Sequence, residues 1–149
     1  MYKKRDKFKR VMGIEGEIKR TYEGVLYDSE MEMKFYRDYL LPKRATGEIM
    51  VIIQQPKFVL QDGFEKYGKN ILPINYIGDF EVIFKDGTSI VYDVKGLPTE
   101  TARIKKKMFD FRYRGKTLIW IALSVKYGGW IEYDALQKKR TKDKKAKNI

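Results

Sequence analysis

The segment YIGDFEVIFKDGTSIVYDVKG, residues 76–96, constrains the fold most, because it contains two β-strand patterns joined by Asp86-Gly87, a common hairpin turn sequence. A two-residue turn at Asp86-Gly87 would mix a polar with an apolar side chain in each cross-strand pair and leave no apolar face. A three-residue loop with Gly87 in the left-handed conformation would instead place Phe80 opposite Tyr92. One face would then carry only apolar side chains: Phe80, Val82, Phe84, Ile90, Tyr92 and Val94. The hydrophobic pattern therefore predicts the three-residue loop.

The same register brings two carboxylates together on the other face of the hairpin. Asp79 would lie directly opposite Asp93, with roughly 5 Å between their β-carbons, and Lys95 would point to the same side as Asp93. Like charges in directly opposite positions destabilise a hairpin. An oxygen-preferring cation held between the two carboxylates would offset that repulsion. The alternative is an exposed face on which both carboxylates are solvated and Lys95 is a nearby ion-pair partner.

Composition limits the chemistry that such a site can use. The chain has 149 residues and is 43% hydrophobic, which fits one folded domain with a hydrophobic core. It contains neither cysteine nor histidine, which excludes disulfides, thiol nucleophiles, Cys/His zinc sites and histidine acid–base chemistry. A metal site would have to use oxygen ligands, as magnesium, manganese and calcium sites do.

The formal net charge of +12 favours polyanionic partners, meaning nucleic acid or an acidic membrane surface. Neither end of the chain has the continuous apolar face of a membrane-binding helix, so nucleic acid is the better expectation. No apolar run approaches 18 residues, and the N-terminus lacks the apolar region of a signal peptide. We therefore expect a soluble, cytoplasmic protein that does not bind membranes.

The ends of the chain differ from its middle. A basic arm (1–20) and a basic tail (137–149) flank residues 21–136, and we expect both ends to be mobile. These charges would either be solvated or contact a polyanion. The middle predicts the order α-β-β-β-α-β, a single α/β domain whose mixed central sheet is flanked by helices.

The first helix is predicted over 27–42, with Ser29 as its N-cap and Pro42 at its end. The second is predicted over 98–114, capped by Thr99 or Thr101. Its apolar positions are Ile104, Met108 and Phe111. The other predicted elements are a strand over 48–60 bent at Pro56, a loop over 61–70, the hairpin, and a buried strand over 116–124.

The order of the acidic residues resembles the PD-(D/E)xK nuclease superfamily. That pattern has an acid on an early helix, an Asp at a strand and Asp/Glu-x-Lys on the next strand. The matching residues are Glu32, Asp79 and Asp93-Val94-Lys95. The blocks YDSEMEMKFY, QPKFVL, YIGDF and DVKG are similar, in that order, to a family of small phage-borne nucleases related to Holliday-junction resolvases, over about residues 22–110. Gly78 stands where the superfamily name has proline.

This resemblance implies a restriction-endonuclease-like fold and Mg²⁺-dependent hydrolysis of DNA, with Mn²⁺ able to substitute. Asp79, Asp93 and the Val94 carbonyl would be metal ligands, and Glu32 would complete the site from its helix. Lys95 would hold the attacking water or neutralise the scissile phosphate. The implied substrate is branched DNA, above all the four-way junction, cut by a homodimer. Two alternatives remain: a nuclease for flap, nicked or single-stranded DNA, and a non-catalytic DNA-binding module.

Several of these residues have a simpler explanation. Glu32 also fits a capping box with Ser29, and Glu30 is the second choice for the helical acid. Glu81 shares the face of Asp79 but fits a surface charge better. The lysines of the second helix would either contact phosphate or only form its solvent face. The expected DNA contacts are Lys105, Lys107, Lys138, Lys139 and Arg140, whereas Trp120 and Trp130 are expected in the core or an interface.

Overall fold

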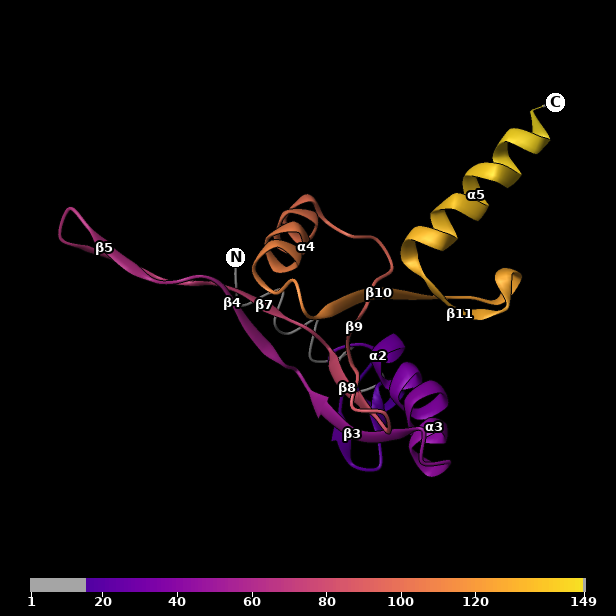
Figure 1. Cartoon of the computed structure of the whole chain (residues 1–149). Coiled ribbons are helices and arrows are strands. Elements are labelled where there is room, and N and C mark those ends of the chain that lie inside the picture. Colours follow the sequence, from indigo (N-terminus) through magenta and orange to yellow (C-terminus); the bar gives the residue numbers. More distant parts are fainter. Residues whose placement is uncertain (1–15, 149) are drawn as a thin grey trace.

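A five-stranded mixed sheet forms the centre of the molecule in the computed structural model, which describes residues 16–148 (Figure 1). The strand order is β11-β10-β9-β8-β3, with β9 and β10 parallel and the other neighbours antiparallel. The predicted mixed sheet with flanking helices is confirmed, but the chain has more strands than the predicted order α-β-β-β-α-β and a further C-terminal helix. The strands are β3 (Ile49–Gln54), β8 (Phe80–Phe84), β9 (Ser89–Val94), β10 (Thr117–Ser124) and β11 (Gly129–Glu132).

Strands β8 and β9 pair in the register that the hydrophobic pattern predicts. Phe80 lies opposite Tyr92. Gly87 has a φ of 85° and donates its N–H to the Phe84 carbonyl at 3.0 Å, which closes the three-residue loop. The predicted apolar face packs into one core cluster, to which Phe80, Val82, Phe84, Ile90, Tyr92 and Val94 all belong.

The first helix covers this apolar face. It consists of α2 (Glu30–Phe35), a π-helical turn η1 (Tyr36–Leu40) and α3 (Leu41–Ala45). Ser29 caps it as predicted, because its Oγ accepts the Glu32 N–H at 3.1 Å. The predicted end at Pro42 is wrong. A proline ring clashes with the carbonyl four residues earlier in a regular α-helix, but here the wider π-helical turn precedes Pro42, and the helix continues to Ala45.

The second face of the sheet lies under α4 (Glu100–Arg112) and a ribbon of β4 (Lys57–Gln61) and β7 (Ile74–Ile77). Thr99 caps α4, as one of the two predicted alternatives. The predicted apolar side of this helix is only partly right, because of its three residues only Met108 packs against the core. Ile104 and Phe111 are 60% and 72% exposed, whereas Phe109 is fully buried. The helix is rotated in this way because an aromatic cluster surrounds Phe109: Phe58, Tyr76 and Tyr113.

The predicted bend at Pro56 separates two strands that belong to different sheets, β3 in the central sheet and β4 in the ribbon. The loop predicted over 61–70 is instead a hairpin of β5 (Phe64–Lys66) and β6 (Lys69–Ile71). Its turn is Tyr67-Gly68, with φ of 52° and 71°. Tyrosine is not a turn residue, so the sequence carried no usual hairpin signal here.

The C-terminal region is helical where a mobile tail was predicted. α5 (Tyr133–Lys147) begins inside the expected domain and runs through the expected tail. Tyr133 and Leu136 are buried and fix its first turns, and the lysines that follow are good helix formers. Asp143 accepts hydrogen bonds from Lys126 and Tyr127, so the helix is also tied down near its end. Lys126 and Tyr127 belong to the 3₁₀ turn η2 (Val125–Tyr127).

Most of the predicted N-terminal arm, residues 1–15, lies outside the described residues. Residues 16–19 form a helical turn, and a short hairpin of β1 (Thr21–Tyr22) and β2 (Val25–Leu26) follows. The buried Tyr27 then joins the aromatic side of the core, and this fixes where α2 begins.

Candidate functional site

Asp79 and Asp93 meet at one end of the β8–β9 pair. The β8–β9 ladder ends at the pair Phe80–Tyr92, so Asp79 is not the directly opposite strand partner of Asp93 that was predicted. Asp79 lies in the bend just before β8, where its N–H donates to the Tyr92 carbonyl at 3.0 Å and its carboxylate is close enough to Asp93 to respond to that charge. Gly78 makes this approach possible, because a Cβ at that position would lie 2.8 Å from a Val91 methyl carbon. The close packing explains why glycine suits the position that precedes the first aspartate.

Asp93 is held firmly in a buried setting. Its side chain accepts a hydrogen bond from the Tyr76 hydroxyl at 2.5 Å, and its Oδ2 lies 3.1 Å from Lys95 Nζ. The Tyr76 oxygen in turn accepts the Trp120 Nε1–H at 2.9 Å. Asp93 is only 5% exposed, so the alternative of two solvated carboxylates on an open face is wrong. Trp120 is a core residue, as expected.

Burial of Tyr76, together with the charge of Asp93, raises the pKa of its hydroxyl. The phenol therefore stays protonated and remains a hydrogen-bond donor to Asp93 at any physiological pH. No sequence pattern singles out Tyr76, because it lies on β7, whose pairing with β4 in the ribbon was not predicted. A tyrosine three residues before the first aspartate is the only signal that was present.

The Asp79 carboxylate is oriented by the backbone of the neighbouring strand, since its Oδ2 accepts the Val94 N–H at 2.7 Å. Burial first, and then the charges of Asp93 and Glu32, raise the pKa of Asp79 to about 8. The hydrogen bonds to Asp79 and Asp93 both engage Oδ2, so they orient the carboxylates without occupying Oδ1. The structure thus brings Val94 to the site, while the role of its carbonyl stays a prediction.

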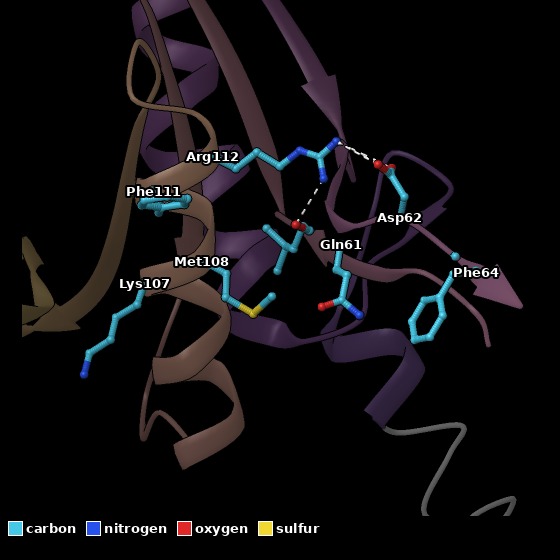
Figure 2. Close-up of a pocket in the computed structure, with 9 residues that line it drawn as sticks. Gln61, Asp62, Phe64, Lys107, Met108, Phe111 and Arg112 are labelled. Carbon is cyan, nitrogen blue, oxygen red and sulfur yellow. Dashed lines mark hydrogen bonds and ion pairs between the residues drawn. The ribbon is translucent and has the colours of Figure 1, made fainter. Parts of the chain in front are cut away.

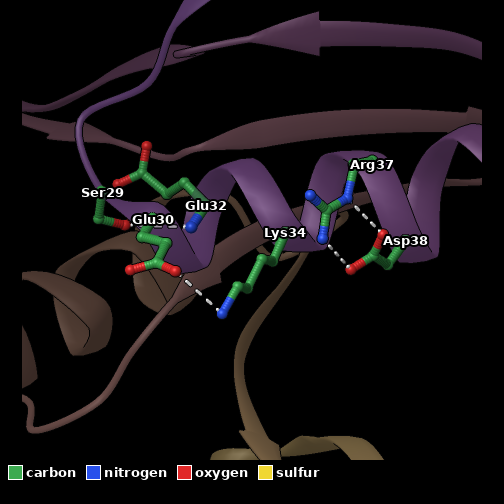
Figure 3. Close-up of polar contacts among 6 residues, drawn as sticks. All are labelled: Ser29, Glu30, Glu32, Lys34, Arg37 and Asp38. Carbon is green, nitrogen blue, oxygen red and sulfur yellow. Dashed lines mark hydrogen bonds and ion pairs between the residues drawn. The ribbon is translucent and has the colours of Figure 1, made fainter. Parts of the chain in front are cut away.

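Glu32 reaches the two aspartates from the first turn of α2. Its pKa is raised, mainly by burial and then by the charge of Asp28, while hydrogen bonds with Ser29 and Asp79 act in the opposite direction. The Glu32 N–H can therefore bond to the capping Ser29 while the Glu32 side chain faces the aspartates. Glu30 leaves the helix on another side and pairs with Lys34 at 3.1 Å (Figure 3). It is not the helical acid of this site.

Other charged residues that the sequence singled out lie apart from these acids. Glu81 is not a free surface charge, because its side chain is 14% exposed and pairs with Lys116 at 2.7 Å. On α4, Lys105 is half-buried and Lys107 is exposed. Lys138, Lys139 and Arg140 are exposed on α5, which extends beyond the sheet (Figure 1).

The carboxylates of Glu32, Asp79 and Asp93 are ligands of the kind that a hard divalent cation prefers, but their side chains do not surround a common point. Within residues 16–148, no group of three or more Asp, Glu, His or Cys side chains has the arrangement needed to hold a metal ion. The chemistry of the donors nevertheless fits magnesium, because every available ligand is an oxygen. The pKa of Asp79 is raised first by burial and then by the charges of Asp93 and Glu32, which no cation offsets fully.

A family model for a protein of unknown function, DUF1064, matches residues 16–129, which contain all of the central sheet except β11 and all the residues of this site. The chain belongs to the DUF1064 family. Comparison with curated proteins and with solved structures found no match. In the described part of this DUF1064 protein, no helix combines the length and apolar character that crossing a bilayer requires.

The stability of the metal-free DUF1064 protein is expected to fall as pH rises from about 4 to about 8. The pKa of Asp79 lies near 8 in the folded state against an ordinary 3.8. A carboxyl that binds its proton more tightly in the folded state stabilises the fold. That contribution is complete below the ordinary pKa of 3.8 and is lost as the pH rises through the folded-state pKa of about 8.

Urea unfolding in a chelator at several pH values measures the free energy of unfolding as a function of pH. Asp79→Asn should flatten that dependence, and the exposed Asp38→Asn should not. An unchanged pH dependence in Asp79→Asn would contradict the prediction.

Proposed function

We propose that this DUF1064 protein is a Mg²⁺-dependent DNA endonuclease with a restriction-endonuclease-like fold, acting on branched DNA. The main support is that Glu32 on α2, Asp79 just before β8 and Asp93 on β9 lie near enough for their charges to act on one another, with Lys95 at 3.1 Å from Asp93. Like charges are rarely brought together in a protein without a functional reason, so clustered acids with shifted pKa values are candidates for catalysis. The net charge of +12 supports a polyanionic substrate.

Glu32, Asp79 and Asp93 would hold the metal, with the Val94 carbonyl as a further ligand. A bound Mg²⁺ supplies charge neutralisation and a more acidic water, which the chain needs because it has no histidine. Mn²⁺ also prefers oxygen ligands and is expected to substitute.

The residues of the chain contribute position and charge to this reaction. Hydrolysis adds a water oxygen to phosphorus, breaks one P–O ester bond and protonates the leaving oxygen. The Lys95 ammonium would neutralise charge on the phosphate or hold the attacking water. Tyr76 and Trp120 keep Asp93 in one orientation, and the Val94 N–H does the same for Asp79. Such preorganisation is what a nuclease requires of its acids.

Four-way junctions are the preferred substrate in this proposal, because the acids occur in sequence blocks similar to those of small phage-borne nucleases related to Holliday-junction resolvases. Resolution of a junction needs two symmetric nicks. We therefore propose that the chain acts as a homodimer, in the host cytoplasm if a phage encodes it.

Cleavage of synthetic DNA tests the proposed function. The purified full chain is incubated with Mg²⁺, or with Mn²⁺, on a four-way junction, a flap, a nicked duplex, single-stranded DNA and an unbroken duplex of the same sequence. Paired symmetric nicks in the junction alone are expected. Cutting of flap, nicked or single strands instead would favour the other nuclease specificity. Tight binding without cutting of any substrate would favour a non-catalytic module.

The basic helix α5 is expected to strengthen DNA binding without taking part in chemistry. Replacing Lys138, Lys139 and Arg140 by Gln should weaken binding and reduce the salt dependence of log Kd by up to about three, because each lost phosphate contact releases about one counterion fewer. The cutting rate at saturating DNA should not change. The matched control replaces three other exposed cations: Lys19, Arg44 and Lys85. A slower rate at saturation in the α5 variant would assign this helix a further role.

A further inference from the structure

A two-stranded arm extends from the body of the molecule. We define the β-arm as residues 62–73, which contain β5 and β6. It forms the far end of the β4–β7 ribbon, and every one of its residues is exposed (Figure 1). An isolated two-stranded hairpin is only marginally stable in water, so an arm with no packing of its own needs a reason to persist.

The tip of the β-arm presents an aromatic ring in an unusual conformation. Tyr67 is 91% exposed, which is the largest exposure among the large hydrophobic residues described. Its φ of 52° lies in the left-handed region, where a bulky residue is strained and Asn or Gly would be comfortable. Stability of the turn therefore does not account for a tyrosine at this position. A strained and exposed aromatic side chain is a candidate contact for a ligand.

Two lysines flank this ring and repel each other. Lys66 and Lys69 are the last cross-strand pair before the turn, directly opposite one another. Like charges in this position destabilise a hairpin, and neither lysine forms an ion pair among the described residues 16–148. Lys66 Nζ instead lies 5.3 Å from the centre of the Tyr67 ring. A polyanion would relieve the repulsion and use all three side chains.

The root of the β-arm is anchored to α4. Arg112 donates to the Leu60 carbonyl at 3.2 Å and pairs with Asp62 at 3.5 Å (Figure 2). These three residues are part of the lining of a groove of about 730 Å³ between α4 and the root of the arm. A Cβ at Gly63 would lie 3.0 Å from the Ile71 carbonyl, so the two strands cross closely at this point. The arm therefore leaves the body in a direction that α4 fixes.

The ribbon also connects the tip to the candidate site. Its inner end is next to Asp79, because the Gln55 N–H donates to the Asp79 carbonyl at 2.9 Å and the Gly78 N–H to the Pro56 carbonyl at 3.0 Å. About ten residues of extended chain separate Gly78 from Tyr67, a reach of up to about 35 Å. That is close to one turn of duplex DNA, roughly 34–36 Å. An arm of this length would contact DNA well away from the cleaved bond.

We infer that the tip of the β-arm is a second DNA contact, in which Tyr67 stacks on an unstacked base at a branch point while Lys66 and Lys69 hold the flanking phosphates. Every base has a π-face, so an aromatic ring between two cations recognises a disrupted helix without reading sequence. An unbroken duplex offers the ring no free base. The inference rests on the proposed function for its partner, and it assigns junction preference to the arm rather than to the carboxylates.

Tyr67→Asn tests this inference without risk to the fold, because Asn suits the turn better than Tyr. In a chelator, this variant should bind a four-way junction about ten-fold or more weakly, within the range for loss of one stacked base. Its affinity for the unbroken duplex should change less than about two-fold. Tyr67→Trp should retain junction binding. A 2-aminopurine at the branch point should change its fluorescence with wild type and not with Tyr67→Asn.

The lysines are tested separately. Lys66→Gln with Lys69→Gln should lower junction affinity and its salt dependence, whereas Arg44→Gln with Lys85→Gln, two exposed cations outside the β-arm, should not match that loss. Wild-type affinity in Tyr67→Asn, or equal losses on junction and duplex, would overturn the inference and leave the nuclease proposal standing. A protein that binds junctions through Tyr67 but cuts no DNA would overturn the nuclease proposal and keep the inference. Failure of wild type to bind DNA would overturn both.

Discussion

Asp93→Asn is expected to abolish Mg²⁺-dependent cutting while DNA binding is kept or becomes tighter. Asparagine fills the same space and can still accept the hydrogen bond that the Tyr76 hydroxyl donates to Asp93 at 2.5 Å. The negative charge that a divalent ion requires is lost, and we expect the cutting rate to fall by at least about a hundred-fold. Binding should not weaken, because a charge that repels phosphate has been removed.

Single-turnover cleavage of a four-way junction at saturating protein measures the first effect, and binding in a chelator measures the second. Asp79→Asn should behave in the same way, because its carboxylate lies beside Asp93 and shares its role. Asp38→Asn is the matched control: it removes an equal charge from an exposed residue that pairs with Arg37. Parallel loss of binding and cleavage in Asp93→Asn would contradict the separation of roles proposed for the acids.

Phe109→Ala is expected to destabilise the fold by about 3–5 kcal/mol, because it removes a fully buried ring and leaves a cavity. The ring packs edge-on against Phe58 at 5.0 Å and contacts Tyr76 at 5.6 Å between centroids. It therefore holds α4 and the ribbon against the second face of the sheet. Because Tyr76 bonds to Asp93, the loss should also loosen the candidate site.

Urea unfolding in a chelator measures this change. Phe111→Ala is the control on the same helix, two residues away: its ring is 72% exposed, and its removal should change the free energy of unfolding by no more than about 0.5 kcal/mol. Equal destabilisation by the two substitutions would mean that α4 does not pack through Phe109.

The register of the β8–β9 hairpin was decided by the sequence, and it brings the chain at Asp79 to the end of β9 that carries Asp93. Side chains alternate across a strand, so a slip of one residue would have moved the whole apolar set to the wrong face. Gly87 and the pairing of Phe80 with Tyr92 follow that prediction. Local signals also fixed the Ser29 cap, whose partner is three residues away in the chain.

Other predictions failed where distant contacts overrode a local pattern. The spacing of Ile104, Met108 and Phe111 fits a helix face, but α4 packs on the ribbon and the sheet through Phe109, with Met108 beside it and the other two exposed. The tail was read as mobile from its charge, yet Tyr133 and Leu136 bury the start of α5 against β10 and β11. The charge of a segment indicates how well its side chains are hydrated. It does not indicate which of its apolar side chains a neighbouring strand or helix will bury.

The sequence by itself determined which residues of the site are acidic, their order along the chain and the register of the β8–β9 hairpin, because that register depends on strand alternation and one turn. Only the tertiary structure decided that Asp93 is buried and held by Tyr76 and Trp120, and that a β-arm leaves the body at Gly63. Those features depend on contacts between segments far apart in the chain, and no local periodicity encodes them.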